Sequence, residues 1–216
     1  MTRFEINNSI VTSESFTDPN FKPKIWTRYE SQEVIETFVL NLFDKKKNGT
    51  FVEIGSEHPK NQSNTYCLEK FYKWSGLAID INPHYVEVYS NERTTPCFNY
   101  DARIFDYKKY FSDNNFPKQI DFLQIDIDLT PRGVGLQALV QLPLNEYRFS
   151  IIAFEHATVQ DFMQAPLRDA QRQLLDTLGY RLVVQGSSDD IWVDPNVFHV
   201  SDYSHLIRDY DLTMPV

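Results

Sequence analysis

The stretch FVEIGSEHPKNQSNTYCLE, residues 51–69, decides the fold of this chain. It begins with a short, mostly apolar run that ends at Gly55, as expected for a strand covered on both faces of a parallel sheet. Residues 56–64 are almost all polar, and Ser63 or Asn64 stands where it can cap a following helix. A strand, a polar loop and a helix start form the first unit of a nucleotide-binding α/β sheet.

The loop after this strand contains a single glycine. Dinucleotide sites place three glycines here so that the backbone can approach a pyrophosphate, whereas this loop keeps only Gly55 and continues with His58-Pro59. A cofactor that brings no phosphate to the loop, and whose ribose is held by a carboxylate, fits better. S-adenosylmethionine is such a cofactor. The alternative that Gly55 merely ends a strand stays open.

A second unit follows the same plan. The apolar run 77–81 carries Asp80 near its end and is followed by Asn82-Pro83 and an expected helix over 84–93. Open α/β sheets bind ligands at the carboxyl ends of their strands, and an acid about 20 residues beyond the first glycine commonly accepts the ribose hydroxyls. Asp80 is therefore a candidate ribose ligand, and a solvated acid before a turn is the alternative.

Two further strands end in ionisable residues. The run 120–128 alternates apolar and acidic residues at its end, so Asp126 and Asp128 share one orientation, and the expected fifth strand ends in Glu155-His156. Carboxylates that project together are costly unless they are solvated, protonated or bridged by a cation. Asp126, Asp128 and Glu155 thus form a candidate divalent-metal site, and His156 or Asp128 is a candidate general base. A hydrogen-bonded structural pair is the alternative.

Helices and a hairpin are expected to complete the sheet. One helix is predicted with Ser31 as its cap, and another follows Pro166 and ends near Gly179. Two β-rich runs, 180–184 and 191–193, are then separated by a hairpin-like connection. A doubly wound, mostly parallel α/β sheet whose last strand is antiparallel is the fold class that these elements predict.

In order, these segments resemble the FkbM-type family of S-adenosylmethionine-dependent methyltransferases, and in particular a branch with His-Pro in the first loop. The resemblance spans about residues 29–195, and the segments that carry it are Tyr29, Ser31 and Gln32, residues 51–69, GLAIDINP (76–83), 91–93, 99–102, IDFLQIDID (120–128), FEH (154–156) and LGY (178–180). It implies the Rossmann-like class I methyltransferase fold, with seven strands and helices on both faces. Most members have a glycine-rich loop and a glycine-acid pair after the fourth strand, whereas here GSEHP and Leu129-Thr130-Pro131 stand at those places.

The resemblance also implies which residues bind the cofactor. Gly55 and its loop would hold the methionine part of S-adenosylmethionine, Asp80 the ribose, and Asp101 with Tyr100 the adenine. The complete predicted set is Glu53, Gly55, Ser56, Asn64, Asp80, Ile81, Tyr100, Asp101 and Asp126. The implied reaction is methyl transfer to a hydroxyl of a sugar, a glycan or another small metabolite. His156 or Asp128 would remove the hydroxyl proton, or a magnesium-like ion at Asp126, Asp128 and Glu155 would lower its pKa.

Composition limits the classes of partner. The chain has 216 residues, 42% of them hydrophobic, which suits a single domain over 29–216 after an N-terminal extension, 1–28. A net charge of −9 disfavours nucleic acid as a partner and suits a sulfonium cation. No signal peptide and no apolar stretch of ~20 residues is evident, so we expect a cytoplasmic protein without membrane contact. Cys67 and Cys97 are expected to be reduced.

Two other function classes stay open. The first is a methyltransferase-like binding module that holds S-adenosylmethionine or a related nucleoside, or no ligand, and serves as a partner subunit. The altered loop motivates this reading, and cofactor affinity without transfer to any acceptor would favour it. The second is a nicotinamide-dependent oxidoreductase, which the missing pyrophosphate glycines disfavour.

Overall fold

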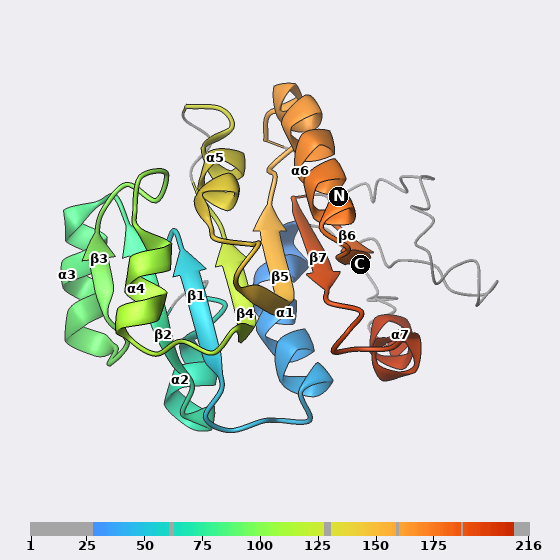
Figure 1. The fold of residues 1–216 in the computed structure, drawn as a ribbon, viewed down its shortest axis with the longest axis horizontal. Helices are drawn as coiled ribbons and strands as arrows, with labels where there is room; N and C mark the ends of the chain where they lie inside the picture. The colour runs from blue at the N-terminus through green and yellow to red at the C-terminus, as the bar shows by residue number, and fades with distance from the viewer. Residues whose placement is uncertain (1–27, 61–62, 128–130, 159, 187, 210–216) are drawn as a thin grey trace.

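The structure is a computed structural model that describes residues 28–60, 63–127, 131–158, 160–186 and 188–209 (Figure 1). Within these ranges the strands are β1 (Thr50–Ile54), β2 (Ser75–Asp80), β3 (Cys97–Asn99), β4 (Gln119–Ile125), β5 (Arg148–Glu155), β6 (Arg181–Gln185) and β7 (Asp189–Val193). The helices are α1 (Arg28–Leu42), α2 (Tyr66–Tyr72), α3 (Pro83–Glu92), α4 (Tyr107–Asp113), α5 (Val134–Gln141), α6 (Ala165–Thr177) and α7 (Val200–Asp209). A short 3-10 helix, η2 (Phe162–Gln164), precedes α6. None of the helices described combines the length and apolar character needed to cross a bilayer.

The strands form one sheet in the order β3-β2-β1-β4-β5-β7-β6. The pairs from β3 to β5 are parallel, and β7 runs antiparallel to both β5 and β6. This arrangement confirms the predicted fold class, including the hairpin that makes the last strand antiparallel. Because the strand order reverses at β1 and β4, their carboxyl ends border the crevice where open α/β sheets bind ligands.

Helices cover both faces of the sheet (Figure 1). On one face α4, α5 and α6 pack on the strands through buried residues that include Val52, Leu123, Phe111, Leu139 and Leu175. On the other face α1, α2 and α7 pack through residues that include Phe51, Phe122, Phe38, Leu68 and Tyr203. The Tyr89 hydroxyl of α3 donates to Glu53 Oε2 at 3.0 Å. Since Glu53 and Phe51 point to the same face of β1, α3 lies on the side of α1 and α2.

Two predicted helix caps were wrong. Helix α1 begins at Arg28, so Ser31 lies inside it, and helix α2 has Thr65 at its N-cap in place of Ser63 or Asn64. The free N–H groups at the start of α2 are satisfied by a carboxylate from α1. Glu36 Oε1 accepts from the N–H of Cys67 at 2.5 Å and of Leu68 at 3.1 Å. A carboxylate is favoured there because it also faces the positive end of the helix dipole.

The ends of β1 and β4 meet at Gly55. Its φ is +84°, and a Cβ at this position would lie 1.7 Å from the carbonyl oxygen of Asp126. The neighbouring backbone is fixed by hydrogen bonds from Gly55 N to Ile79 O at 2.8 Å and from Asp126 N to Ile54 O at 2.9 Å. Only glycine fits this place, because both the left-handed conformation and the close carbonyl exclude a side chain.

We expect Gly55→Ala to destabilise the fold more than Gly179→Ala. Gly179 has a similar φ, +78°, but nothing lies within 4 Å of a Cβ there. Gly179→Ala should therefore lower the free energy of unfolding by about 1–2 kcal/mol, because alanine is forced into the left-handed conformation. Gly55→Ala adds the clash with Asp126 and should lower it by about 2–5 kcal/mol. Urea unfolding followed by circular dichroism measures both, and equal losses would contradict the close approach at Gly55.

Candidate functional site: a cleft at the carboxyl ends of β1 to β4

A cleft with about 950 Å³ of empty space, part of it open to solvent, lies at the carboxyl ends of β1, β2, β3 and β4. It is lined by Ile54, Gly55, Glu57, Ile79, Asp80, Ile81, Asn82, Tyr85, Tyr100, Asp101, Ala102, Arg103, Asp126, Ile127, Pro131 and Val134. The predicted cofactor residues Gly55, Asp80, Ile81, Tyr100, Asp101 and Asp126 are all among them. The structure thus brings these six together.

Asp80 joins the first loop to β2. Its Oδ2 accepts from the backbone N–H of Glu57 at 2.9 Å, and its Oδ1 accepts from Asn82 N at 2.8 Å. The side chain is nearly buried but borders the cleft. Because a carboxylate has about four acceptor positions, each oxygen keeps one for a ligand hydroxyl.

Tyr100 and Asp101 lie at the β3 side of the cleft. Tyr100 is half-exposed, whereas the Asp101 carboxylate accepts from Arg103 Nε at 2.9 and 3.1 Å and from Nη2 at 2.6 Å. The hydrogen bonds from Arg103 lower the pKa of Asp101. Asp101 therefore lines the cleft as a member of an ion pair, and its partner Arg103 lines the same cleft.

The loop between β1 and α2 is held by a buried arginine. The Arg93 side chain is 0% exposed, and its five N–H groups all have acceptors. Nε donates to Glu69 Oε2 at 2.9 Å, Nη1 to Pro59 O at 2.9 Å and Ser63 Oγ at 3.3 Å, and Nη2 to Thr65 O at 3.2 Å and Oγ1 at 2.9 Å. The guanidinium thus fixes the loop at three places.

Two buried carboxylates accompany Arg93. Burial tends to raise the pKa of Glu69, but hydrogen bonds from Thr94 and Thr95 and the charge of Arg93 hold that pKa below its usual value. Burial raises the pKa of Glu53, which accepts from Ser63 Oγ at 3.3 Å, and Arg93 offsets part of the rise. Arg93, which positions the loop, therefore lies between Glu69, whose pKa is lowered, and Glu53, whose pKa is raised.

A second cavity, with about 300 Å³ of empty space, adjoins the cleft on the side of the loop. Its lining is Glu53, Gly55, Ser56, Glu57, His58, Ser63, Asn64, Gln124 and Asp126, and we call it the amide cavity. Gln124 is 1% exposed, and neither of its amide atoms has a hydrogen-bond partner among the described residues. The same holds for Asn64 Oδ1. An unpaired buried amide costs about 1–3 kcal/mol, so these atoms indicate a place for a polar ligand group or water.

Asp126 and Glu155 form a carboxyl pair. Ile125 and Phe154 are partners in the β4–β5 ladder, so Asp126 and Glu155, the residues after them, are neighbours. Burial raises the pKa of Glu155 to about 10, and the hydrogen bond and charge of Asp126 add to the rise. Glu155 therefore keeps its proton at neutral pH.

The predicted metal site is not assembled by the described residues. Within the part of the chain that the structure describes, no three or more His, Cys, Asp or Glu side chains gather as metal ligands do. Asp128, which was also a candidate base, lies outside the described residues. The set of Asp126, Asp128 and Glu155 stays a prediction, of which the structure describes one pair.

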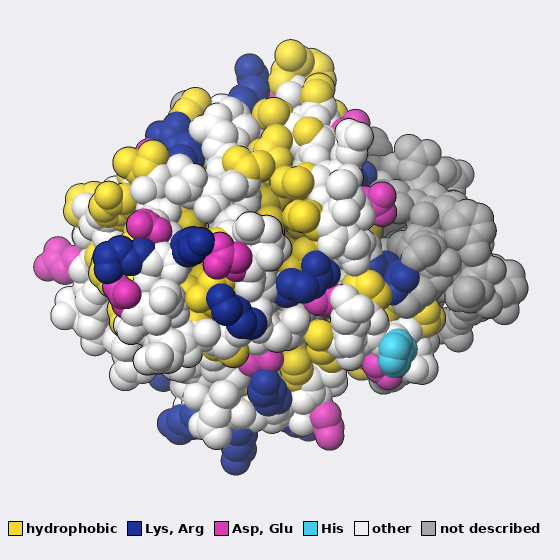
Figure 2. All heavy atoms as spheres, in the orientation of Figure 1, with side chains coloured by type: hydrophobic (Ala, Val, Ile, Leu, Met, Phe, Trp, Pro, Cys, Tyr) yellow, Lys and Arg dark blue, Asp and Glu magenta, His cyan; other side chains and the backbone are white. Residues whose placement is uncertain are grey.

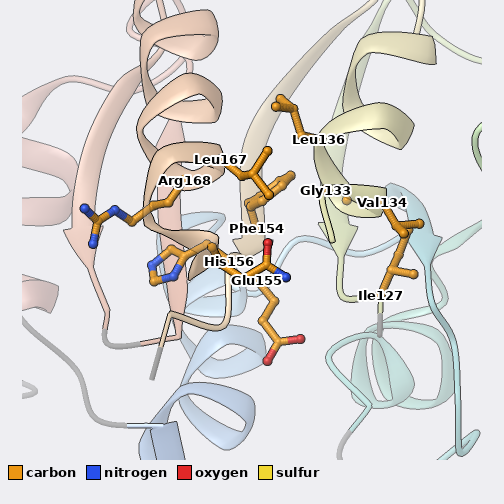
Figure 3. A pocket seen from close by; sticks show the side chains of 11 residues that line it. Ile127, Gly133, Val134, Leu136, Phe154, Glu155, His156, Leu167 and Arg168 are labelled. Atoms are coloured by element: carbon orange, nitrogen blue, oxygen red, sulfur yellow. The ribbon is translucent and has the colours of Figure 1, made fainter. Parts of the chain in front are cut away.

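His156 lies apart from this pair. Its side chain is 2% exposed, and Nε2 lies 3.6 Å from Asp190 Oδ1. Asp190 in turn accepts from Arg172 Nε at 2.7 Å and Nη2 at 2.8 Å. In Figure 3 the imidazole points toward α6, whereas the Glu155 carboxylate points away from it. The two residues were predicted to act at one place, and they face different sides of the strand end.

Three residues of the site were not assigned a role from the sequence. Gln124 is a polar residue inside an otherwise apolar strand, and this interruption of the apolar run is the signal that could have identified it. Arg93 was part of the family resemblance, but its hydrogen bonds depend on loop geometry. Arg103 stands in a polar segment, where nothing in the pattern distinguishes it.

Comparison with known proteins finds likenesses in structure. No family model matches the chain, and no curated protein matches it in sequence. A putative rRNA methylase from Clostridium thermocellum is similar with a TM-score of 0.49 and 14% identity, over 76% of this chain and 92% of that chain. The N-methyltransferase NodS from Bradyrhizobium japonicum WM9 is similar with a TM-score of 0.44 and 12% identity, over 76% and 92%.

A third similar structure is the plantazolicin methyltransferase BpumL, with a TM-score of 0.41 and 15% identity over 62% of this chain and 49% of that chain. BpumL and NodS have both been crystallised with S-adenosylhomocysteine. At identities of 12–15% these likenesses concern the fold alone. The fold is of the class I methyltransferase type. Strand order and direction within this chain carry that assignment.

We expect Arg93→Met to destabilise the fold strongly. The substitution leaves Glu69 buried without its cation, and breaking a buried ion pair costs about 3–5 kcal/mol. Lys109→Met is the control, because the Lys109–Asp113 pair is exposed on α4 and should contribute little. Urea unfolding compares the two, and a similarly small loss for both would contradict the role of Arg93.

We expect Glu155→Gln to change the pH dependence of stability. Folded Glu155 keeps its proton up to about pH 10, whereas the unfolded glutamate loses it near pH ~4.3. Between these values unfolding releases a proton, so rising pH destabilises the wild type but not the glutamine variant. The variant's melting temperature, relative to wild type, should increase from pH 6 to pH 9.

The matched control for this pH series is Glu146→Gln. Glu146 pairs with Lys108 at the surface, and its hydrogen bond with Lys108 lowers its pKa. It is therefore ionised in both the folded and unfolded states from pH 6 to pH 9, and its substitution should shift melting by a constant amount. A constant difference for Glu155→Gln as well would contradict the raised pKa of Glu155.

Proposed function

We propose that this chain is an S-adenosylmethionine-dependent methyltransferase whose cofactor occupies the cleft and the amide cavity. The observation that carries the proposal is the continuity of the two spaces. The cleft presents carboxylates at the ends of β2, β3 and β4, and the amide cavity shares Gly55, Glu57 and Asp126 with it. A single elongated ligand, with a nucleoside at one end and an amino acid at the other, fits two connected spaces that are lined in this way.

The nucleoside end suits the wider cleft. The free acceptor positions of Asp80 would take the two ribose hydroxyls while the carboxylate keeps its bonds to the loop and to Asn82. Tyr100 is exposed enough to stack on an adenine ring. Ile81, also exposed, would pack on the same nucleoside.

The amino-acid end suits the amide cavity. A methionine moiety carries an ammonium group, which donates hydrogen bonds, and a carboxylate, which accepts them. Gln124 offers one unpaired donor and one unpaired acceptor, and Asn64 Oδ1 offers a second acceptor. The sulfonium between the two ends would lie near Asp126, because Asp126 lines both spaces.

The proposed reaction is transfer of the methyl group to a hydroxyl oxygen of a small molecule, sugar or glycan. A carbon–oxygen bond forms as the carbon–sulfur bond breaks, S-adenosylhomocysteine leaves, and the hydroxyl proton passes to a base. The protein aligns oxygen, carbon and sulfur. His156 remains the proposed base among the described residues. Because its side chain is 2% exposed, it can act only on a group that enters the small crevice that it lines together with Phe154 and Glu155 at the end of β5. Membership of the FkbM-type family is part of the same proposal.

Titration calorimetry with S-adenosylmethionine and S-adenosylhomocysteine tests the proposal on wild type and Gln124→Met. We expect micromolar binding by wild type and a loss of at least tenfold, about 1.4 kcal/mol, in the variant. The same substitution should stabilise the free protein by about 1–3 kcal/mol, because it removes an unpaired buried amide. Weaker binding by a more stable protein cannot be explained by damage to the fold.

Gln171→Met is the matched control. Gln171 is 0% exposed on α6, and its amide atoms also have no partner among the described residues, but it lines neither space. It should gain stability without losing affinity. No binding by wild type would contradict the proposed function. Unchanged binding by Gln124→Met would contradict the place of the amino-acid end.

A further inference from the structure

A groove lies at the edge of the sheet opposite to the cofactor cleft, where β1 and β2 begin. It has about 710 Å³ of empty space, part of it open to solvent. Its walls are Thr50 of β1, Ser75 and Gly76 of β2, residues 94–96 before β3, and the end of α4 with the loop that leads to β4. Figure 1 shows this loop passing across the lower part of β1. We call this space the amino-end groove.

The amino-end groove is separate from the cleft, and the two share no lining residue. Thr50, the first residue of β1, lines the groove, whereas Ile54, the last residue of the same strand, lines the cleft. An extended strand rises about 3.3 Å per residue, so these two residues lie roughly 13 Å apart. A small molecule in the groove therefore does not touch a cofactor in the cleft.

The lining of the groove carries no charge. None of its residues is Asp, Glu, Lys, Arg or His, although 24% of the chain is charged. Two acids hold the lining from behind, and each is paired with a cation: Asp121, which accepts from Thr50 N, with Lys46, and Glu69, which accepts from Thr94 N, with Arg93. A charged group that entered the groove would lose water without meeting an opposite charge.

The polar groups of the groove are hydroxyls and amides, from Thr50, Ser75, Thr94, Thr95, Asn114 and Asn115. The side chains of Ser75 and Asn115 make no hydrogen bond to another described residue. Thr95 is 4% exposed, and its Oγ1 also has no partner among the described residues. Since hydroxyls and amides both donate and accept, the groove offers neutral, unpaired groups of both kinds. An apolar ligand would leave them unpaired.

Two aromatic rings complete the lining. Tyr110 and Phe116 are half-buried, and their ring centroids lie 5.8 Å apart with the ring planes at 62°. In Figure 2 the surface at the lower end of α4 is mostly white, the colour of uncharged polar side chains and backbone. Aromatic carbon thus stands beside neutral hydrogen-bonding groups. A sugar ring has the matching surfaces, because its C–H groups lie on its faces and its hydroxyls point outward from its edge.

We propose that the amino-end groove binds an uncharged sugar, free or as one residue of a glycan. The sugar's hydroxyls pair with the side chains of Ser75 and Asn115, and a face of its ring lies against Tyr110 or Phe116. The sugar in this groove is not the methyl acceptor, because the cleft lies at the other end of the strands. The inference therefore goes beyond the proposed methyl transfer and does not depend on it.

Saturation-transfer NMR on the full chain, without cofactor, tests the proposal. The probes are glucose, galactose, mannose and N-acetylglucosamine, with linear trisaccharides of glucose and of N-acetylglucosamine. We expect at least one neutral sugar to bind, and its charged counterpart, the uronic acid or the free amine, to bind about tenfold more weakly. Cyclohexanol should also bind more weakly, because it leaves the amides unpaired. Absence of binding by every neutral sugar, or equal binding of the charged counterpart, would overturn the proposal.

The trisaccharides distinguish the two sources of the sugar. A trisaccharide that binds more tightly than its monosaccharide supports a glycan as the ligand, because further rings contact the protein beside the groove. Equal affinities support a free sugar.

Asn115→Gly tests the location. Asn115 has a φ of +55°, which glycine adopts freely, so the variant loses the amide and keeps the loop conformation. It should weaken the sugar about fivefold. Asn48→Gly is the matched control, because Asn48 is also exposed and has a φ of +58° but does not line the groove. Equal sugar affinities of the two variants would overturn the assignment to this groove.

The two proposals fail separately. A protein that binds S-adenosylmethionine but no sugar overturns only this inference. A protein whose sugar binding is lost in Asn115→Gly, but which binds no S-adenosylmethionine, overturns only the proposed function. Gln124→Met should bind the sugar as wild type does, with or without S-adenosylhomocysteine. A sugar that binds only with S-adenosylhomocysteine present, and equally well to Asn115→Gly, would belong to the cleft and would overturn the inference.

Discussion

The buried guanidinium of Arg93 is the interaction on which the candidate site depends. A glycine-rich loop reaches a cofactor because its backbone is free to adopt unusual conformations, but this loop carries His58 and Pro59 where such glycines would stand. Its shape is held by four hydrogen bonds donated by one planar cation, and a fifth ties that cation to Glu69 of α2. Arginine suits this role because its donors form a rigid fork and because it stays charged when buried. The loop is therefore defined by a side chain from the end of α3, with α2 and β2 between the loop and α3 in the sequence.

The same arrangement joins the loop to the rest of the cleft. Arg93 holds Ser63, which donates to Glu53 in the amide cavity, and Asp80 holds the loop from the other side through Glu57 N. Gly55, the first residue of the loop, has no side chain and so lets the loop backbone lie against the backbone at the end of β4. The same hydrogen bonds thus hold the loop and the strand ends that line the cleft, and a ligand meets surfaces that are already in place. Pre-organisation of this kind saves the ordering cost that a flexible loop would add to binding.

The sequence predicted the sheet, the antiparallel last strand and the gathering of Asp80, Tyr100, Asp101 and Asp126, because periodicity and strand ends are local signals. It misplaced the α2 cap because the capping carboxylate, Glu36, comes from another helix. The opposite directions of Glu155 and His156 follow from strand alternation once the strand is known to extend to Glu155. The unpaired amide of Gln124 and the pairing of Asp101 with Arg103 depend on tertiary geometry, which no spacing rule contains.

The position of β7 has a consequence for how the chain folds. This strand lies between β5 and β6 and is the last of the described strands in sequence, so β6 has no partner until β7 arrives. During synthesis β1 to β5 can pair as they emerge, whereas β6 waits. Completion of the sheet thus waits for β7, which pairs with β5 across the intervening α6 and β6, and non-local pairing of this kind slows folding. The edge of β5 stays open in the meantime, and an unpaired edge is where incomplete chains associate.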